Sequence, residues 1–360
     1  MRCRTLALAI ILAGCAAVSW AGHGGESPLT ATAQARLAHL NLSTDDLRKL
    51  NDKEVIVQAL PARSARQMAG FGALLADAPP ATFVELYRNL EVFDQSPYIL
   101  ASGRFSAPPN LEDLKNLTID DKDLYALAKS RPGDSDVKLS EPEIARFQAL
   151  AGSAPRLTPK LKAQLAAEYK KMMVERVKDY LRNGAAALGS FADKEKAIGL
   201  HEAFVALARE QAGTAGHCEH LYSYLEKYPE GAAPDTESFI YWAKQKFGSL
   251  KPVINLVHVV IHREGERVYI ASKQIYSSHY TEAALSVAEL IPFAGEPGQP
   301  RTVVAYSIRL QTDMLGGAFS FMKKRMAQPR MLGMLKASLA GLRLHMEAMA
   351  RASVQTKAGL

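Results

Sequence analysis

The stretch from Val253 to Leu310 constrains the fold of this chain more than any other part, because most of it has the pattern of β-strands. Its first part, VINLVHVVIH, is rich in β-branched residues, and the Glu264-Gly265 pair that follows indicates a tight hairpin. The predicted strands are Val253 to His262, Arg267 to Ser277, Tyr280 to Leu290 and Thr302 to Leu310. Consecutive strands with short connections favour an antiparallel meander.

A long amphipathic helix is expected after this meander, from about Gly317. Its apolar side chains recur at helical spacing on one face: Leu332, Leu335, Leu339, Leu342, Met346 and Met349. Pro329 should kink or split the helix near its start, because proline has no amide hydrogen and its ring clashes with the preceding turn. Such a helix can cover one face of the sheet.

The residues before the meander fall into two parts. The first should mix helices and strands, beginning with a helix capped by Ser43, and the second has the pattern of successive helices. A capping box at Ser140 to Glu143 and an apolar stripe that ends at Asn183-Gly184 belong to the second. The predicted divisions are residues 41 to 110 (N-terminal part), 111 to 250 (helical block), 251 to 350 (sheet and C-terminal helix) and 351 to 360 (tail).

We therefore predict an α+β fold. A curved antiparallel sheet is gripped by the long C-terminal helix, and the largely helical block is inserted between the N-terminal and C-terminal β-containing parts.

The N-terminus has the pattern of a secretory signal peptide, with two arginines before an apolar run too short to span a bilayer. Two processing sites remain open. Ser19-Trp20-Ala21 favours a signal peptide of residues 1 to 21, whereas Leu12-Ala13-Gly14-Cys15 resembles a lipobox, which would remove residues 1 to 14 and place a lipid on Cys15. In both cases we expect an exported protein, periplasmic or associated with the envelope, with a tether at residues 22 to 40.

Cysteine and charge content limit the disulfides and the kinds of partner that are expected. Cys3 would leave with the signal peptide and Cys15 would leave or carry lipid, so Cys218 would remain alone and no internal disulfide is expected. Loss of Arg2 and Arg4 lowers the formal charge from +7 by two, to +5. No dense run of Lys and Arg indicates a nucleic-acid site, and the sequence carries no signal for an oligomeric state.

A sheet followed by a long amphipathic helix resembles the helix-grip arrangement of the START and Bet v 1-like (SRPBCC) superfamily. The stretch DAPPATFVELYRNLEVF, from Asp77 to Phe93, is similar to the segment in which those proteins leave the first strand for a helix. The resemblance implies an apolar cavity between sheet and helix that holds lipids, sterols or other hydrophobic molecules, and some members of the superfamily are enzymes.

Four further segments look like those of an uncharacterised family of exported bacterial proteins. They are GRFSAPPNLEDLKNLTIDDKDLYAL, RPGDSDVKL, YWAKQKFGSLKPVINLVHVVIHR and KQIYSSHYTEAAL. This resemblance covers most of the mature chain but implies no activity. It also implies cysteines on both sides of the Pro-Gly-Asp turn, where this sequence has Ser130 and Ser135.

The segment KQIYSSHYTEAAL supplies the candidate ligand-binding residues. In a regular strand, one side of it carries Gln274, Tyr276, Ser278 and Tyr280. Tyrosines suit a pocket wall because a large apolar ring ends in a polar hydroxyl, although the two tyrosines could equally pack under the C-terminal helix. Arg309, at the end of the last strand, could hold a ligand head group or form an ion pair with Asp313.

Catalysis is the weaker interpretation of the same segment. His279 would act as a general base oriented by Glu282 or Asp313, and His258 is a second candidate. The sequence contains no phosphate-binding glycine loop, no GxSxG elbow and no HExxH helix. It therefore indicates no cofactor and disfavours the enzyme classes that such motifs identify.

His217, Cys218 and His220 are candidate metal ligands, because imidazole and thiolate groups bind zinc. No further ligand follows at a recognisable spacing, so a solvated helix start is favoured and no metal site is predicted. A combination of basic and apolar residues around Lys323 could contact an anionic membrane surface, although a solvated helix face is the simpler interpretation.

Three functions follow from these observations. The first is an exported protein that binds a hydrophobic small molecule or lipid between the sheet and the C-terminal helix. The second is a structural or interaction protein of the cell envelope with a solid core. The third is a hydrolase-type enzyme that acts on a lipid or cell-wall component.

Overall fold

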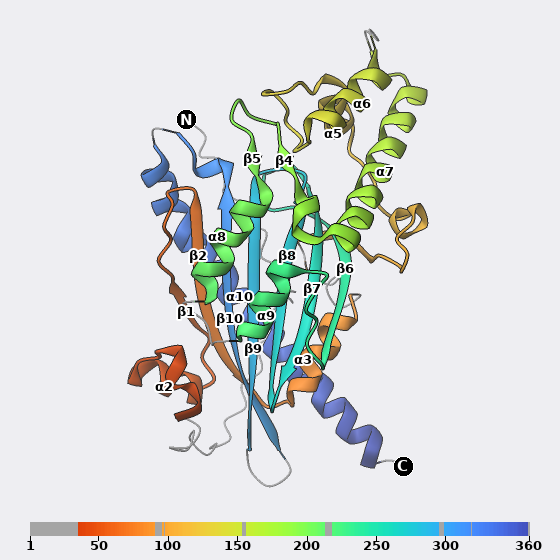
Figure 1. Cartoon of the computed structure of the whole chain (residues 1–360). Coiled ribbons are helices and arrows are strands. Elements are labelled where there is room, and N and C mark those ends of the chain that lie inside the picture. The colour runs from red at the N-terminus through yellow and green to blue at the C-terminus, as the bar shows by residue number, and fades with distance from the viewer. Residues whose placement is uncertain are drawn as a thin grey trace.

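An antiparallel sheet of eight strands forms the centre of the molecule in the computed structural model (Figure 1), in the order β1-β2-β10-β9-β8-β7-β6-β3. The structure describes residues 35–90, 96, 98–152, 156–212, 218–294, 299–317 and 319–358. The predicted signal peptide with Cys15, most of the tether, and His217 lie outside these residues. The strands are β1 (Ile56–Ala59), β2 (Gln67–Ala76), β3 (Ile99–Arg104), β6 (Thr236–Gln245), β7 (Val253–Glu264), β8 (Arg267–Ser277), β9 (Thr281–Ala294) and β10 (Pro300–Thr312).

Helices cover both faces of this sheet. The helical elements are η1 (Ala38–Leu40), α2 (Thr44–Asn51), α3 (Pro80–Arg88), η2 (Leu111–Leu114), α5 (Asp121–Lys129), α6 (Glu141–Ala151), α7 (Pro159–Asn183), η3 (Gly184–Leu188), α8 (Leu200–Ala212), α9 (Glu219–Lys227), η4 (Asp313–Leu315) and α10 (Ser320–Ala358), and a short hairpin joins β4 (Ser190–Phe191) to β5 (Ile198–Gly199). In Figure 1, α8 and α9 lie in front of the sheet and α10 lies behind it. The α+β prediction, with a curved sheet and a C-terminal helix packed on it, is confirmed.

The central strands are apolar on both sides because both faces are covered. In β7, Val257 and Val259 pack into the cluster beneath α10 and α3, whereas Leu256 and Val260 pack into the cluster beneath the helical block. Strands buried on two faces lose the alternation of polar and apolar residues. Residues 236–245, which fall inside the predicted helical block, form the strand β6.

Helix α10 approaches the sheet closely at two glycines of β2. A Cβ atom on Gly70 would lie 2.9 Å from Met331 Cε, and one on Gly72 would overlap Leu339. Glycine weakens a strand by its propensity. Here the absence of a side chain at both positions allows α10 to pack closely against β2. The helix continues across Pro329 without a break, so the expected split does not occur.

Two further observations complete the fold. Helix α8 begins at Leu200, directly after the β4–β5 hairpin. Among the described residues, no helix has both the length and the apolar character needed to cross a membrane.

Candidate functional site

A cleft of about 710 Å³ opens beside the turn between β8 and β9. We call it the basic cleft. Its lining residues are Asp136, Lys138, Asp193, Lys194, Ser249, Leu250, Lys251, His279, Tyr280, Asp313, Met314, Lys323, Met326, Ala327 and Arg330. They come from the loop before α6, the β4–β5 hairpin, the loop between β6 and β7, the β8–β9 turn, η4 and the first turns of α10. The cleft therefore lies where the helical block, the sheet and α10 meet.

The β8–β9 turn is held in an unusual backbone conformation at Tyr280, whose φ is +62°. Non-glycine residues rarely adopt such a value, and it persists where surrounding contacts impose it. The Tyr280 carbonyl accepts hydrogen bonds from the Asp313 amide at 3.0 Å and from Thr312 Oγ1 at 2.8 Å. Its hydroxyl accepts a bond from the Lys251 amide at 3.1 Å. These contacts fix the turn as one wall of the cleft.

The imidazole of His279 is buried behind that wall. Its Nε2 lies 3.1 Å from Asp123 Oδ1, and its Nδ1 lies 2.8 Å from the Asp136 carbonyl oxygen. Both ring nitrogens thus face oxygen acceptors, which leaves neither nitrogen directed at a substrate. Because Asp123 and not Glu282 or Asp313 contacts the ring, the arrangement proposed for general-base catalysis is absent from the described residues.

The two carboxylates named as partners of His279 have other partners. Glu282 pairs with Arg66 and accepts a hydrogen bond from Gln311 Nε2 at 2.9 Å. Asp313 Oδ2 lies 2.9 Å from Lys138 Nζ.

Lys138 forms the floor of the basic cleft. Its side chain is 2% exposed, and Nζ also lies 3.0 Å from Asp193 Oδ2. Its backbone amide donates to the Ser278 carbonyl at 2.9 Å, which ties the loop before α6 to the β8–β9 turn. A buried lysine between two carboxylates holds three segments of the chain together, and loss of any one member would leave an uncompensated charge.

The charged residues that line the cleft carry a net positive charge. Five lysine or arginine side chains and three aspartates line it, a difference of two. Lys251 pairs with Asp136. Neither Lys194 nor Arg330 has a side-chain hydrogen bond or ion pair within the described part of the chain, and Lys323 Nζ donates only to the Gly316 carbonyl, at 2.8 Å.

Exposed apolar side chains are found at the start of α10, the helix whose residues Lys323, Met326 and Arg330 line the cleft. Phe319, Phe321 and Met322 have 66%, 77% and 58% of their surface exposed, and Met326, which lines the cleft, has 44%. Large apolar side chains grouped in one exposed place indicate contact with a ligand, a membrane or a partner.

The other ligand-binding candidates lie outside the cleft. A register shift between Leu256 and Val257 places both Ile275 and Tyr276 in the cluster beneath the helical block, so the alternation expected of a regular strand fails there. The Tyr276 hydroxyl lies 2.7 Å from the Tyr169 hydroxyl on α7. Gln274 is buried, and Ser278 Oγ accepts a hydrogen bond from the Ile254 amide at 2.9 Å.

Arg309 and His258 are also remote from the cleft. Arg309 Nη1 donates to the Pro61 carbonyl at 2.7 Å and lies 3.1 Å from Glu210 Oε2 on α8, so it does not pair with Asp313. His258 Nδ1 lies 2.9 Å from the Tyr180 hydroxyl, and burial lowers the pKa of this imidazole to about 3. A neutral, enclosed histidine of this kind is part of the core.

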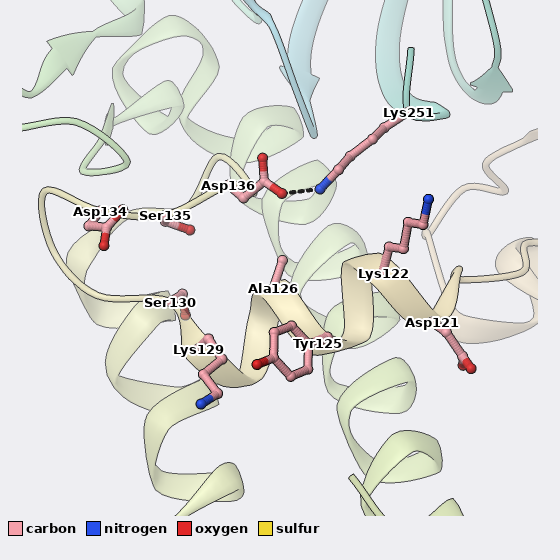
Figure 2. A pocket seen from close by; sticks show the side chains of 10 residues that line it. All are labelled: Asp121, Lys122, Tyr125, Ala126, Lys129, Ser130, Asp134, Ser135, Asp136 and Lys251. Carbon is pink, nitrogen blue, oxygen red and sulfur yellow. Dashed lines mark hydrogen bonds and ion pairs between the residues drawn. The ribbon is translucent and has the colours of Figure 1, made fainter. Parts of the chain in front are cut away.

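A second pocket of about 510 Å³ is lined by α5 and the loop that follows it, together with the Lys251–Asp136 ion pair (Figure 2). Both residues of that pair line the two pockets. Ser130 and Ser135 lie on facing segments of the second pocket, and each hydroxyl donates to a nearby backbone carbonyl, of Leu127 at 2.8 Å and of Val137 at 2.6 Å. At these two positions the resemblance implies cysteines. In this chain each position holds a serine whose hydroxyl forms a local hydrogen bond.

The four segments that carry the sequence resemblance all reach this region. Asp123, Asp136, Lys251 and His279 each come from a different one of them, and hydrogen bonds or ion pairs connect them. No protein-family model matches the chain, and the comparison with curated proteins found no match.

Proposed function

We propose that this protein is an exported binding protein for an anionic amphiphile, a molecule with a carboxylate or phosphate head and an apolar tail. The observation that carries the proposal is the proximity of unpaired cations in the basic cleft to exposed aromatic and methionine side chains at the start of α10. The proposal keeps the lipid-binding class that the sequence favours, but moves the ligand from beneath the helix to its N-terminal end.

Electrostatics favours an anionic head group in the cleft. Lys194, Lys323 and Arg330 supply the positive surplus above the buried Lys138. Hydrogen bonds from a charged donor to a carboxylate or phosphate oxygen are about twice as strong as neutral ones. A head group here would pair side chains that have no acidic partner among the described residues.

The apolar tail would cover Phe319, Phe321, Met322 and Met326, which are otherwise exposed to water. Methionine suits a ligand of variable shape because its side chain is flexible and polarizable. The same surface could receive a lipid from an anionic bilayer, in which case the protein would contact a membrane peripherally.

Close packing beneath α10 argues for the cleft over the interior. Met331, Leu335 and Leu339 pack into the cluster between α10 and the sheet, and the two glycines of β2 bring the helix near the strand. Strands β2 and β10 are adjacent in the sheet, and α10 lies across one face of it. The same packing favours the envelope structural protein as the second candidate function, with the helical block as its partner surface.

Oleate is a suitable probe, because it carries one carboxylate and one long tail. We expect the wild-type protein to bind it in a calorimetric titration and the Lys323→Gln/Arg330→Gln double variant to bind about tenfold more weakly, since tenfold corresponds to ~1.4 kcal/mol and two charge-assisted contacts are lost. Arg325→Gln is the matched control, because Arg325 is exposed on the same helix but does not line the cleft.

Three comparisons decide whether the ligand class is correct. Oleyl alcohol should bind more weakly than oleate, and inorganic phosphate should not compete with oleate at equal concentration. Sedimentation with phosphatidylglycerol vesicles distinguishes a bilayer lipid from a free one. Equal binding by the double variant, or no binding of oleate and of vesicles, would overturn the proposal and favour the structural protein.

A further inference from the structure

Cys218, which precedes α9, lies beside two residues from the end of β7. One ligand atom from each of Cys218, His262 and Glu264 falls within 4.8 Å of the others. These residues are far apart in the sequence and meet because α9 packs on the sheet beside the β7–β8 hairpin. We infer that Cys218, His262 and Glu264 form a site for a divalent cation, and that the cation is Zn²⁺.

The imidazole of His262 is arranged as a metal ligand. Its Nδ1 lies 2.9 Å from Thr236 Oγ1, whereas Nε2 is buried and has no hydrogen-bond partner within the described residues. The side chain is 5% exposed, so water does not readily satisfy Nε2. Metal-bound histidines commonly donate their second ring N–H to a neighbouring oxygen, which fixes the tautomer and leaves the other nitrogen for the metal. Thr236 can serve as that oxygen.

The set of donor atoms favours zinc. Thiolate, imidazole and carboxylate bind Zn²⁺ at about 2.0 to 2.3 Å, usually in a tetrahedron, whereas Ca²⁺ and Mg²⁺ require oxygen ligands. Glu264 is exposed at the end of the hairpin, so its carboxylate is able to move towards the other two donors. The thiol of Cys218 is buried, and a cysteine binds zinc as a thiolate, so zinc binding would displace the thiol proton.

His220 is the nearest candidate for a fourth ligand. It lies in the first turn of α9, and its ring centre is 6.4 Å from that of His262. Cys218 and His220 are two of the three residues that the sequence singles out as metal ligands. The sequence gives no further ligand near them, because the rest of the site comes from β7. A bound zinc ion would join the start of α9 to the β7–β8 hairpin, away from the basic cleft.

The test uses the full chain, stripped of metal with a chelator and then titrated with Zn²⁺ in competition with a chromophoric chelator. We expect one Zn²⁺ per chain and a rise in Tm, because a ligand that binds only the folded state stabilises it. Co²⁺ should give the ultraviolet charge-transfer absorption of a cobalt–thiolate bond. Glu264→Gln should weaken Zn²⁺ binding about tenfold, Cys218→Ser about a hundredfold or more, and the latter should abolish the cobalt–thiolate band.

Glu219→Gln is the matched control, because Glu219 is exposed next to Cys218 and belongs to no part of the proposed site. Glu264→Gln changes an exposed residue, so a loss of affinity there cannot be assigned to misfolding of the core. Failure of the wild-type chain to bind Zn²⁺, or binding by Cys218→Ser with unchanged affinity, would show that Cys218 is only a buried apolar side chain.

Discussion

Replacement of Lys273 by methionine is expected to stabilise the folded protein by ~2–4 kcal/mol at pH 6, since removing an unpaired buried charge relieves its desolvation. The Lys273 side chain is fully buried beneath the helical block. Its Nζ donates to the Leu225 carbonyl at 3.1 Å and lies 3.8 Å from the centre of the Phe204 ring, without a carboxylate within ion-pair distance among the described residues. Burial lowers the pKa of this amine to about 7.

The pH dependence has a definite sign. Between pH 7 and about 10.4, the usual pKa of lysine, the unfolded chain binds a proton that the folded chain does not. The stability of the wild-type protein therefore rises with pH through this window, and below pH 7 the penalty stays constant. The advantage of Lys273→Met should shrink towards zero by about pH 10.

Urea unfolding at pH 6 and pH 10 measures both quantities. Lys336→Met is the control, because Lys336 is exposed on α10 and its replacement should change the free energy of unfolding by less than ~0.5 kcal/mol. His258 adds an acid dependence below pH 6.5, so the variant and the wild-type protein are compared with each other at the same pH. An effect of Lys273→Met that is equal at both pH values would contradict the burial argument.

Gly184→Ala should destabilise the protein by more than ~4 kcal/mol, because it combines backbone strain with overlap in the core. Gly184 ends α7 with φ +60° and ψ −138°. A Cβ atom there would overlap the carbonyl oxygen of Tyr228, which belongs to the backbone and cannot rotate away. The measurement is the midpoint of urea unfolding, with circular dichroism to follow helix content.

Gly152→Ala separates the two causes. Gly152 ends α6 with φ +52° and ψ −140°, nearly the conformation of Gly184, but a Cβ atom there meets nothing within 4 Å. Its replacement should cost only the backbone term, ~1–3 kcal/mol. Equal effects of the two substitutions would mean that the chain near Tyr228 shifts easily, against the expectation of a rigid contact.

Regular periodicity made much of the fold predictable. The stripe of α7, the apolar face of α10 and the hairpin of β7 and β8 each depend on local pattern, and each is found in the expected place. Strand β6 was missed because both of its faces are buried, so Tyr241 and Trp242 point into different cores and no alternation is visible. Pro329 lies inside the continuous helix α10, so the split that its sequence position allowed does not occur.

Only part of the basic cleft could be predicted. His279 and Tyr280 were candidates because they lie in the segment KQIYSSHYTEAAL, and Asp313 because it follows the last strand. Asp123 and Lys138 were missed, because their roles arise from contacts across 156 and 175 residues of sequence. The register shift at Leu256 and Val257, which moved Tyr276 out of the expected face, has no local signature in the sequence either.

The helical block leaves and rejoins the sheet at neighbouring places, since Arg104 at the end of β3 pairs with Tyr241 of β6. Such an insertion could be taken for an autonomous module. Its apolar core, however, is shared with the sheet: Trp242, Leu256 and Val260 lie in the same cluster as Tyr169 of α7 and Phe204 of α8. Removing the block would expose one face of the sheet, so block and sheet should form one cooperative unit and melt in a single calorimetric transition.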